Sequence, residues 1–218
     1  MRGAMITRRR VLRVLAASAV VTVTRLTARA AVPTTGPEHP AIVWSDYVAL
    51  EKAPDGAVRP HRILDVPGRG YRWDNPGARI NFRTDARAVT VHLRYSDRHT
   101  SPTARAPVGV WLIDGRGDER WIFSTRATTT RREVEEVDVA LLGPADGKAH
   151  DYAIVLPYGD SVDFRGLTMS AGATLERPAP RPAFRYVAYG DSVTHGFTAS
   201  RVDRTYPYLV AESRGWQS

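Results

Sequence analysis

"AVTVHLRY", residues 88–95, predicts the fold of the larger part of this 218-residue chain. Apolar and polar residues alternate along it, which places Val89, Val91, Leu93 and Tyr95 on one face of an extended strand. A period of two is typical of a strand with one face on a core and the other toward solvent. We therefore expect residues 88–95 to belong to an antiparallel sheet.

Similar short segments lie on both sides of this stretch. "ARINFR" (78–83) alternates in the same way, and "VGVWLIDG" (108–115) ends in Asp-Gly, a hairpin signal. Further segments of this kind occupy residues 120–125, 133–142, 150–157 and 162–172. Strands at this spacing, without a long helical repeat, predict a mostly β protein with an antiparallel sandwich over residues 41–175.

The pattern changes near the C-terminus. "ERPAPRPA" (176–183) has three prolines and predicts a stiff linker. "FRYVAY" (184–189) is largely aromatic and apolar, which predicts a strand buried on both faces of a parallel sheet. "TYPYLVAESRGW" (205–216) predicts a helix capped by Thr205, with Tyr208, Leu209 and Val210 on its apolar face and Gly215 at its end. Residues 184–218 thus resemble the first half of a βαβ unit.

"GDSVTHG" (190–196) lies where that predicted strand ends. Open α/β sheets place their reactive groups at the carboxyl ends of strands. A serine hydroxyl there becomes a nucleophile once a general base takes its proton, and the oxyanion that forms needs fixed N–H donors. Gly190 and Gly196 would let the backbone bend and approach a substrate closely. Ser192 is therefore the candidate catalytic residue.

The block "GDSVTHG" after a hydrophobic strand resembles the first conserved block of the SGNH, or GDSL-type, hydrolases. These are esterases and lipases on a flavodoxin-like three-layer sheet. The resemblance implies that Ser192 is the nucleophile and that its backbone N–H is one oxyanion donor. It also implies that Gly190, Asp191 and Gly196 shape the turn. A G-x-S-x-G elbow, the usual α/β-hydrolase signature, is absent from this block.

The β-rich part adds to the resemblance. "GARINFRTDARAVTVHLRY", "WLIDG", "HDYAIVLP" and "FRGL" look like the jelly-roll domain that precedes the catalytic domain in carbohydrate-esterase-like members. Those enzymes remove acetyl groups from polysaccharides. The resemblance thus implies an exported esterase that acts on an acylated carbohydrate or another small ester, without a cofactor.

The family takes further oxyanion donors from a later glycine and a later asparagine, and its histidine and aspartate from a D-x-x-H block. The printed sequence ends at Ser218 before any of these. We therefore expect an N-terminal fragment that is inactive alone. His195, three residues after Ser192, is interpreted as a loop residue, because a base must also be oriented by a third group.

Two other functions stay open from the residues themselves. One is a carbohydrate-binding β-sandwich with a non-catalytic remnant at its C-terminus, and the other is a cell-wall-associated interaction protein. Trp73, Trp111 and Trp121 could stack on sugar rings, although tryptophan in a sandwich is commonly part of the core. A metal site is not expected, because the candidate ligands show no recognisable spacing; these are His92, Asp97, His99 and Asp163.

The N-terminus predicts the compartment. Residues 1–30 have a basic start with Arg8-Arg9-Arg10, a short apolar run at 14–23 and Ala28-Arg29-Ala30 as a cleavage site. This order predicts a twin-arginine-type export signal, followed by a Pro- and Thr-rich linker at 31–40. The apolar run is shorter than the roughly 20 residues that span a bilayer, so no stable membrane anchor is expected.

The charge of the chain is concentrated in this signal. The formal net charge is +8, and seven of the 31 basic residues lie within the first 30 positions. Without them 24 basic residues face 23 acidic ones, so the basic surface typical of a nucleic-acid-binding protein is not expected. The chain has no cysteine, which excludes disulfides, thiolate metal sites and a cysteine nucleophile.

Overall fold

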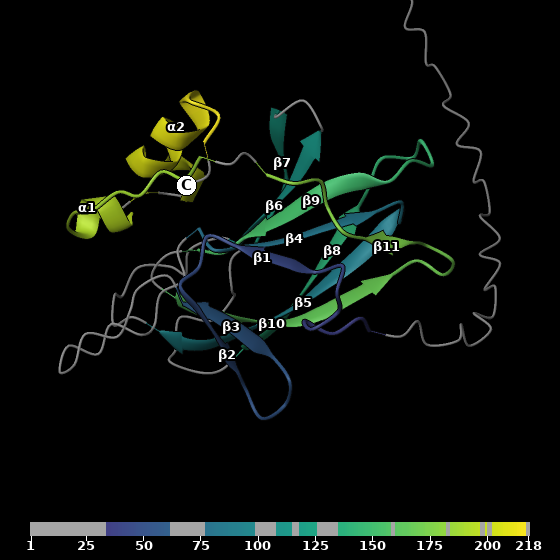
Figure 1. Ribbon diagram of the computed structural model, residues 1–218. Coiled ribbons are helices and arrows are strands. Elements are labelled where there is room, and N and C mark those ends of the chain that lie inside the picture. Colours follow the sequence, from purple (N-terminus) through teal and green to yellow (C-terminus); the bar gives the residue numbers. More distant parts are fainter. Residues whose placement is uncertain are drawn as a thin grey trace, which may run out of the picture. The chain divides into compact units, whose positions relative to one another are not determined.

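Most strands of the protein belong to one of two antiparallel sheets, seen in a computed structural model (Figure 1). The structure describes residues 34–61, 77–98, 108–114, 118–125, 135–157, 160–181, 184–196, 199 and 202–216. The export signal predicted at 1–30 lies outside these ranges. The domain boundaries drawn from the sequence therefore stay predictions.

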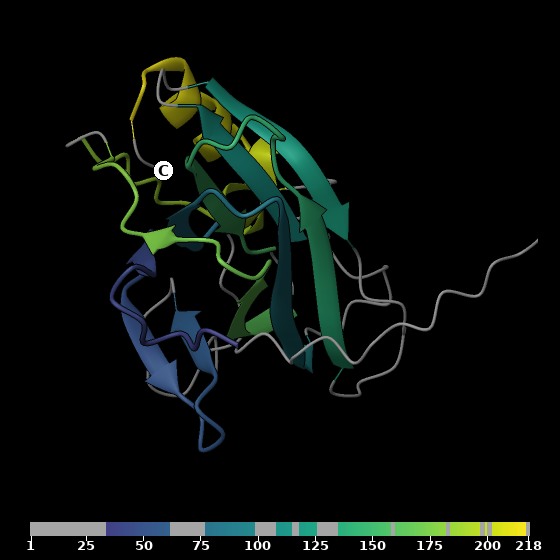
Figure 2. The ribbon, with the colours of Figure 1, turned by 90° about the vertical axis from the view of Figure 1, so that its right-hand side faces the viewer.

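The strand order of each sheet is clear from the pairing. The first sheet runs in the order β1 (Val43–Ser45), β4 (Arg79–Thr84), β9 (His150–Val155), β6 (Val108–Asp114), β7 (Asp118–Thr125), with β11 (Leu175–Glu176) also beside β4. The second sheet runs in the order β2 (Ala49–Lys52), β3 (Val58–His61), β10 (Asp160–Met169), β5 (Ala88–Arg98), β8 (Glu135–Leu142). The strands can be followed from a second direction in Figure 2.

The alternation in residues 88–95 is confirmed. Val89, Val91, Leu93 and Tyr95 of β5 are buried, whereas the residues between them are partly exposed or exposed. The expected hairpin is also present, since β6 and β7 pair antiparallel with Asp114 opposite Asp118. The sequence did not single out the short strands β1, β2 and β3, which lie before residue 62.

One core joins the inner faces of the two sheets. The first sheet contributes Ile80, Phe82, Tyr152 and Ile154, and these cluster with the buried residues of β5 and β10. The ring of Trp44 in β1 meets that of Phe164 in β10 edge-on, with centroids 5.8 Å apart. Burial of apolar area between two sheets is the main source of stability in such a sandwich.

Part of the other face of the first sheet is buried as well, which alternation alone did not predict. Arg79 and Asn81 of β4 were expected on the solvent side, yet both are buried. On β9, Ala153 and Val155 form a second apolar cluster with Val202 and Tyr208 from the C-terminal segment. Part of the outer face of the first sheet is thus covered by residues from beyond 200.

The strand predicted at residues 184–189 is not formed, and this prediction was wrong. Phe184, Val187 and Tyr189 are 73, 85 and 101 % exposed, and strand-like pairing in this segment is limited to one bridge residue at Arg185. A strand needs a neighbour for its N–H and C=O groups, and the strand pairs of the described chain are all antiparallel pairs within the sandwich. The flavodoxin-like sheet is not seen in these residues.

The predicted C-terminal helix is present. Two short helical elements precede it, α1 (Ser192–His195) and η1 (Val202–Arg204), and α2 itself spans Tyr206–Ser213. Thr205 is the N-cap residue, although its hydroxyl donates to the Val202 carbonyl instead of capping an α2 N–H. Tyr208 and Ala211 are the buried residues of α2, while the predicted face residues Leu209 and Val210 are 44 and 36 % exposed. No helix in the described ranges is long and apolar enough to cross a membrane.

Candidate active site around Ser192

The turn that carries Ser192 is shaped by its neighbours. Asp191 has an extended backbone, and its Oδ1 accepts a hydrogen bond from the Val193 N–H at 3.0 Å, which caps α1. Gly196 ends α1 in the left-handed conformation, with φ of 106°, and its N–H donates to the carbonyls of Ser192 and Val193 at 3.1 Å. The result is a tight, locally hydrogen-bonded turn with Ser192 exposed at its start.

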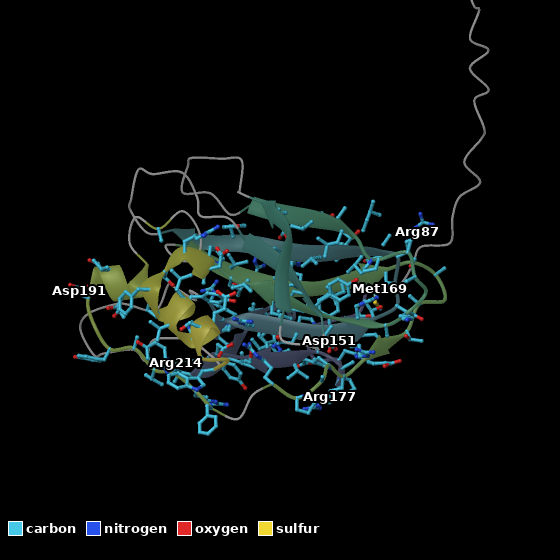
Figure 3. All side chains as sticks on the ribbon, turned by 90° about the horizontal axis from the view of Figure 1, so that it is seen from above. Arg87, Asp151, Met169, Arg177, Asp191 and Arg214 are labelled. Carbon is cyan, nitrogen blue, oxygen red and sulfur yellow. The ribbon has the colours of Figure 1, made fainter. Side chains whose placement is uncertain are left out.

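Gly190 is required for a reason that the sequence did not supply. A Cβ atom at this position would lie 2.9 Å from Cβ of Thr194 and would clash with its Oγ1. Thr194 therefore packs directly over the backbone that leads into Asp191 and Ser192. Figure 3 shows Asp191 beside α1 and Arg214 at the end of α2, at the opposite end of the view from Arg87 and Met169.

The hydroxyl of Ser192 has no hydrogen bond to any residue that the structure describes. The side chain of His195 lies outside the described part of the chain, so the interpretation of His195 as a loop residue stays a prediction. The roles assigned to Gly190, Asp191, Ser192 and Gly196 rest on the sequence block. What the structure adds is the local geometry that these four residues adopt.

Two tyrosines of α2 are site residues that the sequence analysis missed. The Tyr206 hydroxyl lies 2.7 Å from Oγ1 of Thr194, which joins α2 to the Ser192 turn. Tyr208 accepts a hydrogen bond from Nη2 of Arg79 in β4 at 3.1 Å. Sequence spacing gave no signal for either pair, because each joins residues that tertiary structure alone brings together.

Arg79 is the centre of a buried polar cluster. Its guanidinium carbon lies 5.3 Å from the centroid of the Tyr208 ring, and its Nε lies 3.5 Å from Oδ2 of Asp46. The same Asp46 oxygen accepts a hydrogen bond from Nη1 of Arg181 at 2.9 Å. Because a buried charge is stable only when it is paired, this cluster ties together the first sheet, α2 and the proline-rich segment before residue 184.

His92 pairs with two neighbours on the second sheet. One ring nitrogen lies 2.7 Å from Oδ1 of Asp138, and the other lies 2.7 Å from Oγ1 of Thr168. This order of carboxylate, imidazole and hydroxyl also occurs in nucleophilic triads. Here, however, the Thr168 hydroxyl also meets that of Thr34 at 3.2 Å, beside the β-bridge between Thr35 and Leu167. We assign the group to holding residues 34–35 on β10.

Asp163 is engaged in ion pairs. It is buried, and it accepts hydrogen bonds from Nε of Arg59 at 2.6 Å and from Nη2 of Arg94 at 2.8 Å. Arg94 also pairs with Asp55. Burial by itself would lower the pKa of Arg94, but the two carboxylates together hold it above its usual value. Among the described residues, no group of three potential metal ligands is close enough to hold an ion.

Several other candidates cannot be compared with the structure. His99 and Trp73 lie outside the described residues, and the structure gives Asp97 by its backbone. Trp111 and Trp121 face each other in the register of β6 and β7, but their side chains are not described. Stacking of tryptophan on sugar rings thus stays a prediction.

Comparison with known proteins identifies a class of fold. No protein-family profile matches the chain, and no curated protein matches it. Among solved structures, the salicylyl-acyltransferase SsfX3 from a tetracycline biosynthetic pathway has a TM-score of 0.65 at 22 % identity, over 85 % of this chain and 53 % of that chain. A GDSL-like lipase from Bacteroides ovatus gives 0.62 at 16 % identity, over 81 % of this chain and 52 % of the other.

A family two carbohydrate esterase from Cellvibrio japonicus gives a TM-score of 0.57 at 16 % identity, over 85 % of this chain and 50 % of that chain. The protein therefore shares its fold with parts of a salicylyl-acyltransferase, a GDSL-like lipase and a family two carbohydrate esterase. At these identities the likeness concerns the fold. The chain spans about half the length of each of these three proteins.

Proposed function

We propose that this chain is the nucleophile-bearing part of an exported SGNH-type serine esterase. The observation that carries the proposal is the turn at residues 190–196, where the block "GDSVTHG" presents an exposed Ser192 on a backbone fixed by Asp191 and Gly196. Ser192 would attack the ester carbonyl, release the alcohol and form an acyl-enzyme that water hydrolyses. Its own N–H would be one donor to the oxyanion.

The proposed substrate is an acylated carbohydrate or another small ester. This follows from the sequence resemblance and is supported by the shared fold with a carbohydrate esterase. That match covers 85 % of this chain and so includes most of the β-sandwich, which agrees with a polysaccharide-directed enzyme. The fold shared with an acyltransferase agrees with this first step, since an acyl group held on a serine can pass to another acceptor as well as to water.

We further propose that the general base and the acid that orients it come from residues other than the 218 printed here. In support of this, the chain spans only about half the length of each of the three solved structures that share its fold. A serine without a base is a weak nucleophile. The 218-residue chain alone should therefore not hydrolyse an aryl acetate, and hydrolysis that disappears in Ser192→Ala would contradict this part of the proposal.

The decisive experiment begins with the nucleotide sequence after codon 218. Because the chain spans about half the length of the three structures that share its fold, we expect the remaining coding sequence to supply an asparagine-containing block and a D-x-x-H block. The joined protein should hydrolyse p-nitrophenyl acetate and release acetate from acetylated xylan. Ser192→Ala should lower kcat/KM by at least about a thousandfold, because the covalent step is lost.

Ser213→Ala is the matched control. Ser213 lies on α2, and its hydroxyl donates to the Val210 carbonyl. This substitution should leave kcat/KM within about twofold, since it removes one exposed hydrogen bond. If Ser192→Ala keeps the activity of the joined protein, Ser192 is not the nucleophile.

A further inference from the structure

Helix α2 carries two tyrosines that point to different partners. Residues two apart on an α-helix are separated by about 200° around its axis, because the helix has 3.6 residues per turn. Tyr208 is 4 % exposed and Tyr206 is 43 % exposed, in agreement with opposite faces. One face of α2 therefore lies on the sandwich, while the other is available to the Ser192 turn.

The inner contact of α2 is an anchor on the first sheet. Tyr208 packs with Ala153 and Val155 of β9, and its hydroxyl accepts the hydrogen bond from Arg79. Arg79 is itself held by Asp46. A hydrogen bond from a charged donor is among the stronger ones in proteins, and here the donor is buried. The position of α2 on the sheet is thus fixed by both packing and charge.

The outer contact of α2 holds the nucleophile turn. The hydroxyls of Tyr206 and Thr194 are 2.7 Å apart, and Thr194 lies two residues after Ser192. Because Thr194 also packs against Gly190, one threonine side chain touches both the residue before Asp191 and the helix α2. Tyr206 is therefore linked through Thr194 to the backbone on both sides of Ser192.

A second contact joins the chain before the Ser192 turn to the chain after α2. The ring of Tyr186 stacks near that of Trp216, with centroids 6.2 Å apart and planes at 28°. Trp216 follows the end of α2, and its N–H donates to the Ala211 carbonyl. The chain before the turn and the chain after α2 are thus in contact through these two rings.

We propose that Tyr206 and Tyr208 are positioning residues, and that through them the β-sandwich sets the position of Ser192. The path of contacts runs from Arg79 to Tyr208, along α2 to Tyr206, and through Thr194 to the turn. On this proposal the sandwich holds the Ser192 turn in place through α2, and the two parts are not structurally independent. The catalytic meaning of this link rests on the proposed function, but the link itself is a structural claim.

The first test is a double-mutant cycle in the full 218-residue chain. Tyr206→Phe and Thr194→Val each remove one hydroxyl and keep nearly the same shape. Amide hydrogen exchange of Val193 and Gly196, measured by NMR, should become about three- to tenfold faster in each variant. The double variant should be no faster than the single ones, because both remove the same interaction.

Two controls accompany the cycle. Tyr189→Phe removes a hydroxyl from a fully exposed tyrosine and should leave exchange at α1 unchanged. Thr194→Ser restores the hydroxyl and should return the exchange rates toward those of the original chain. If Tyr206→Phe does not change exchange at Val193 and Gly196, or if the effects of the two variants are additive, the proposal is overturned.

The second test asks whether the contact of Tyr208 with the sandwich controls the Ser192 turn. Tyr208→Phe should speed exchange in α2 and in α1, because it loosens the anchor on which both depend. Tyr206→Phe should speed exchange in α1 and leave β4 and β9 unchanged. If Tyr208→Phe leaves α1 unaffected, the sandwich does not position the turn.

These outcomes are independent of whether Ser192 is a nucleophile. Amide exchange reports the contacts of the turn, and Ser192→Ala should leave the effects of the Tyr206 and Tyr208 variants in place. Loss of ester hydrolysis in Ser192→Ala reports the proposed function. A failure of one proposal can therefore be told apart from a failure of the other.

Discussion

The backbone of Gly190 lies directly against the side chain of Thr194, so that a Cβ atom there would come within 2.9 Å of the threonine Cβ. This contact bends the chain tightly around Asp191 and Ser192. It gives the first glycine of "GDSVTHG" a steric role, whereas Gly196 has a conformational one with φ of 106°.

Substitution of Gly190 should therefore disturb the Ser192 turn. In Gly190→Ala, Thr194 has to move, and its hydrogen bond to Tyr206 should be lost. We expect large amide shift changes at residues 191–196 in NMR spectra and little change in the sandwich. Gly36→Ala is the control, because a Cβ at Gly36 would meet nothing within 4 Å. Equal perturbation by the two variants would contradict the steric role.

The ion pairs of Asp163 should stabilise the second sheet. The carboxylate is 1 % exposed and meets Arg59 and Arg94, so Asp163→Ala leaves two guanidinium groups without this partner. We expect the free energy of unfolding, measured in urea, to fall by about 3–5 kcal/mol.

The control for Asp163 is an exposed ion pair. Glu38 and Lys52 are 2.7 Å apart, with side chains 67 and 57 % exposed. Glu38→Ala should change the free energy of unfolding by less than about 1 kcal/mol. A loss in Asp163→Ala no larger than that of Glu38→Ala would show that burial of this carboxylate adds nothing.

The core contact between the sheets should matter more than the exposed aromatic residues after the linker. Phe164 is fully buried against Trp44, so Phe164→Ala removes a large apolar side chain and leaves a cavity. We expect a loss of about 3–5 kcal/mol in the free energy of unfolding. Phe184→Ala, at an exposed position, should stay within about 0.5 kcal/mol. Similar losses in both variants would argue against the observed burial.

One carboxylate should make stability depend on acidic pH. The Thr174 N–H donates to Oδ1 of Asp85 at 2.8 Å, and this bond lowers the pKa of Asp85 below its usual value. Its stabilisation is therefore complete above the unfolded pKa of about 3.9 and is lost as the pH falls through the lower folded pKa. Asp85→Asn should be less stable than the original chain at pH 6.

The difference between the two chains should shrink as the pH falls below about 4, because the carboxyl of the unfolded chain is protonated first and that of the folded chain follows at its lower pKa. Unfolding in urea at several pH values between 6 and 2 measures this difference. A constant difference over that range would show that the Thr174 hydrogen bond does not favour the charged form of Asp85.

The sandwich could be predicted well because its signal is local. Alternation in residues 88–95 follows from the pleat of a strand, and Val89, Val91 and Leu93 are buried as that pattern requires. The helix at 205–216 was recognised from local signals too, with Pro207 in its first turn and Gly215 after its end. The strand order in each sheet could not be predicted, because it depends on pairs far apart in sequence.

In the candidate site, too, the local features could be predicted and the contacts between distant residues could not. The block "GDSVTHG" singles out Ser192, and the capping of α1 by Asp191 is a local hydrogen bond. The roles of Thr194, Tyr206 and Arg79 were not predicted, because no sequence pattern indicates which distant residues these side chains contact in the folded chain. The strand predicted at 184–189 failed for a related reason: apolar composition favours a strand, but pairing needs a neighbour.

The sequence by itself therefore determined the antiparallel β-sandwich and the candidate nucleophile, since both depend on periodicity and on neighbouring residues. Only the tertiary structure decided which faces are buried and what supports the Ser192 turn. Arg79 alternates like a solvent-facing residue, yet it is buried, with its Nη2 hydrogen-bonded to Tyr208 of α2 and its Nε 3.5 Å from a carboxylate oxygen of Asp46. Burial of a charge is a property of the assembled surroundings, and no local pattern encodes it.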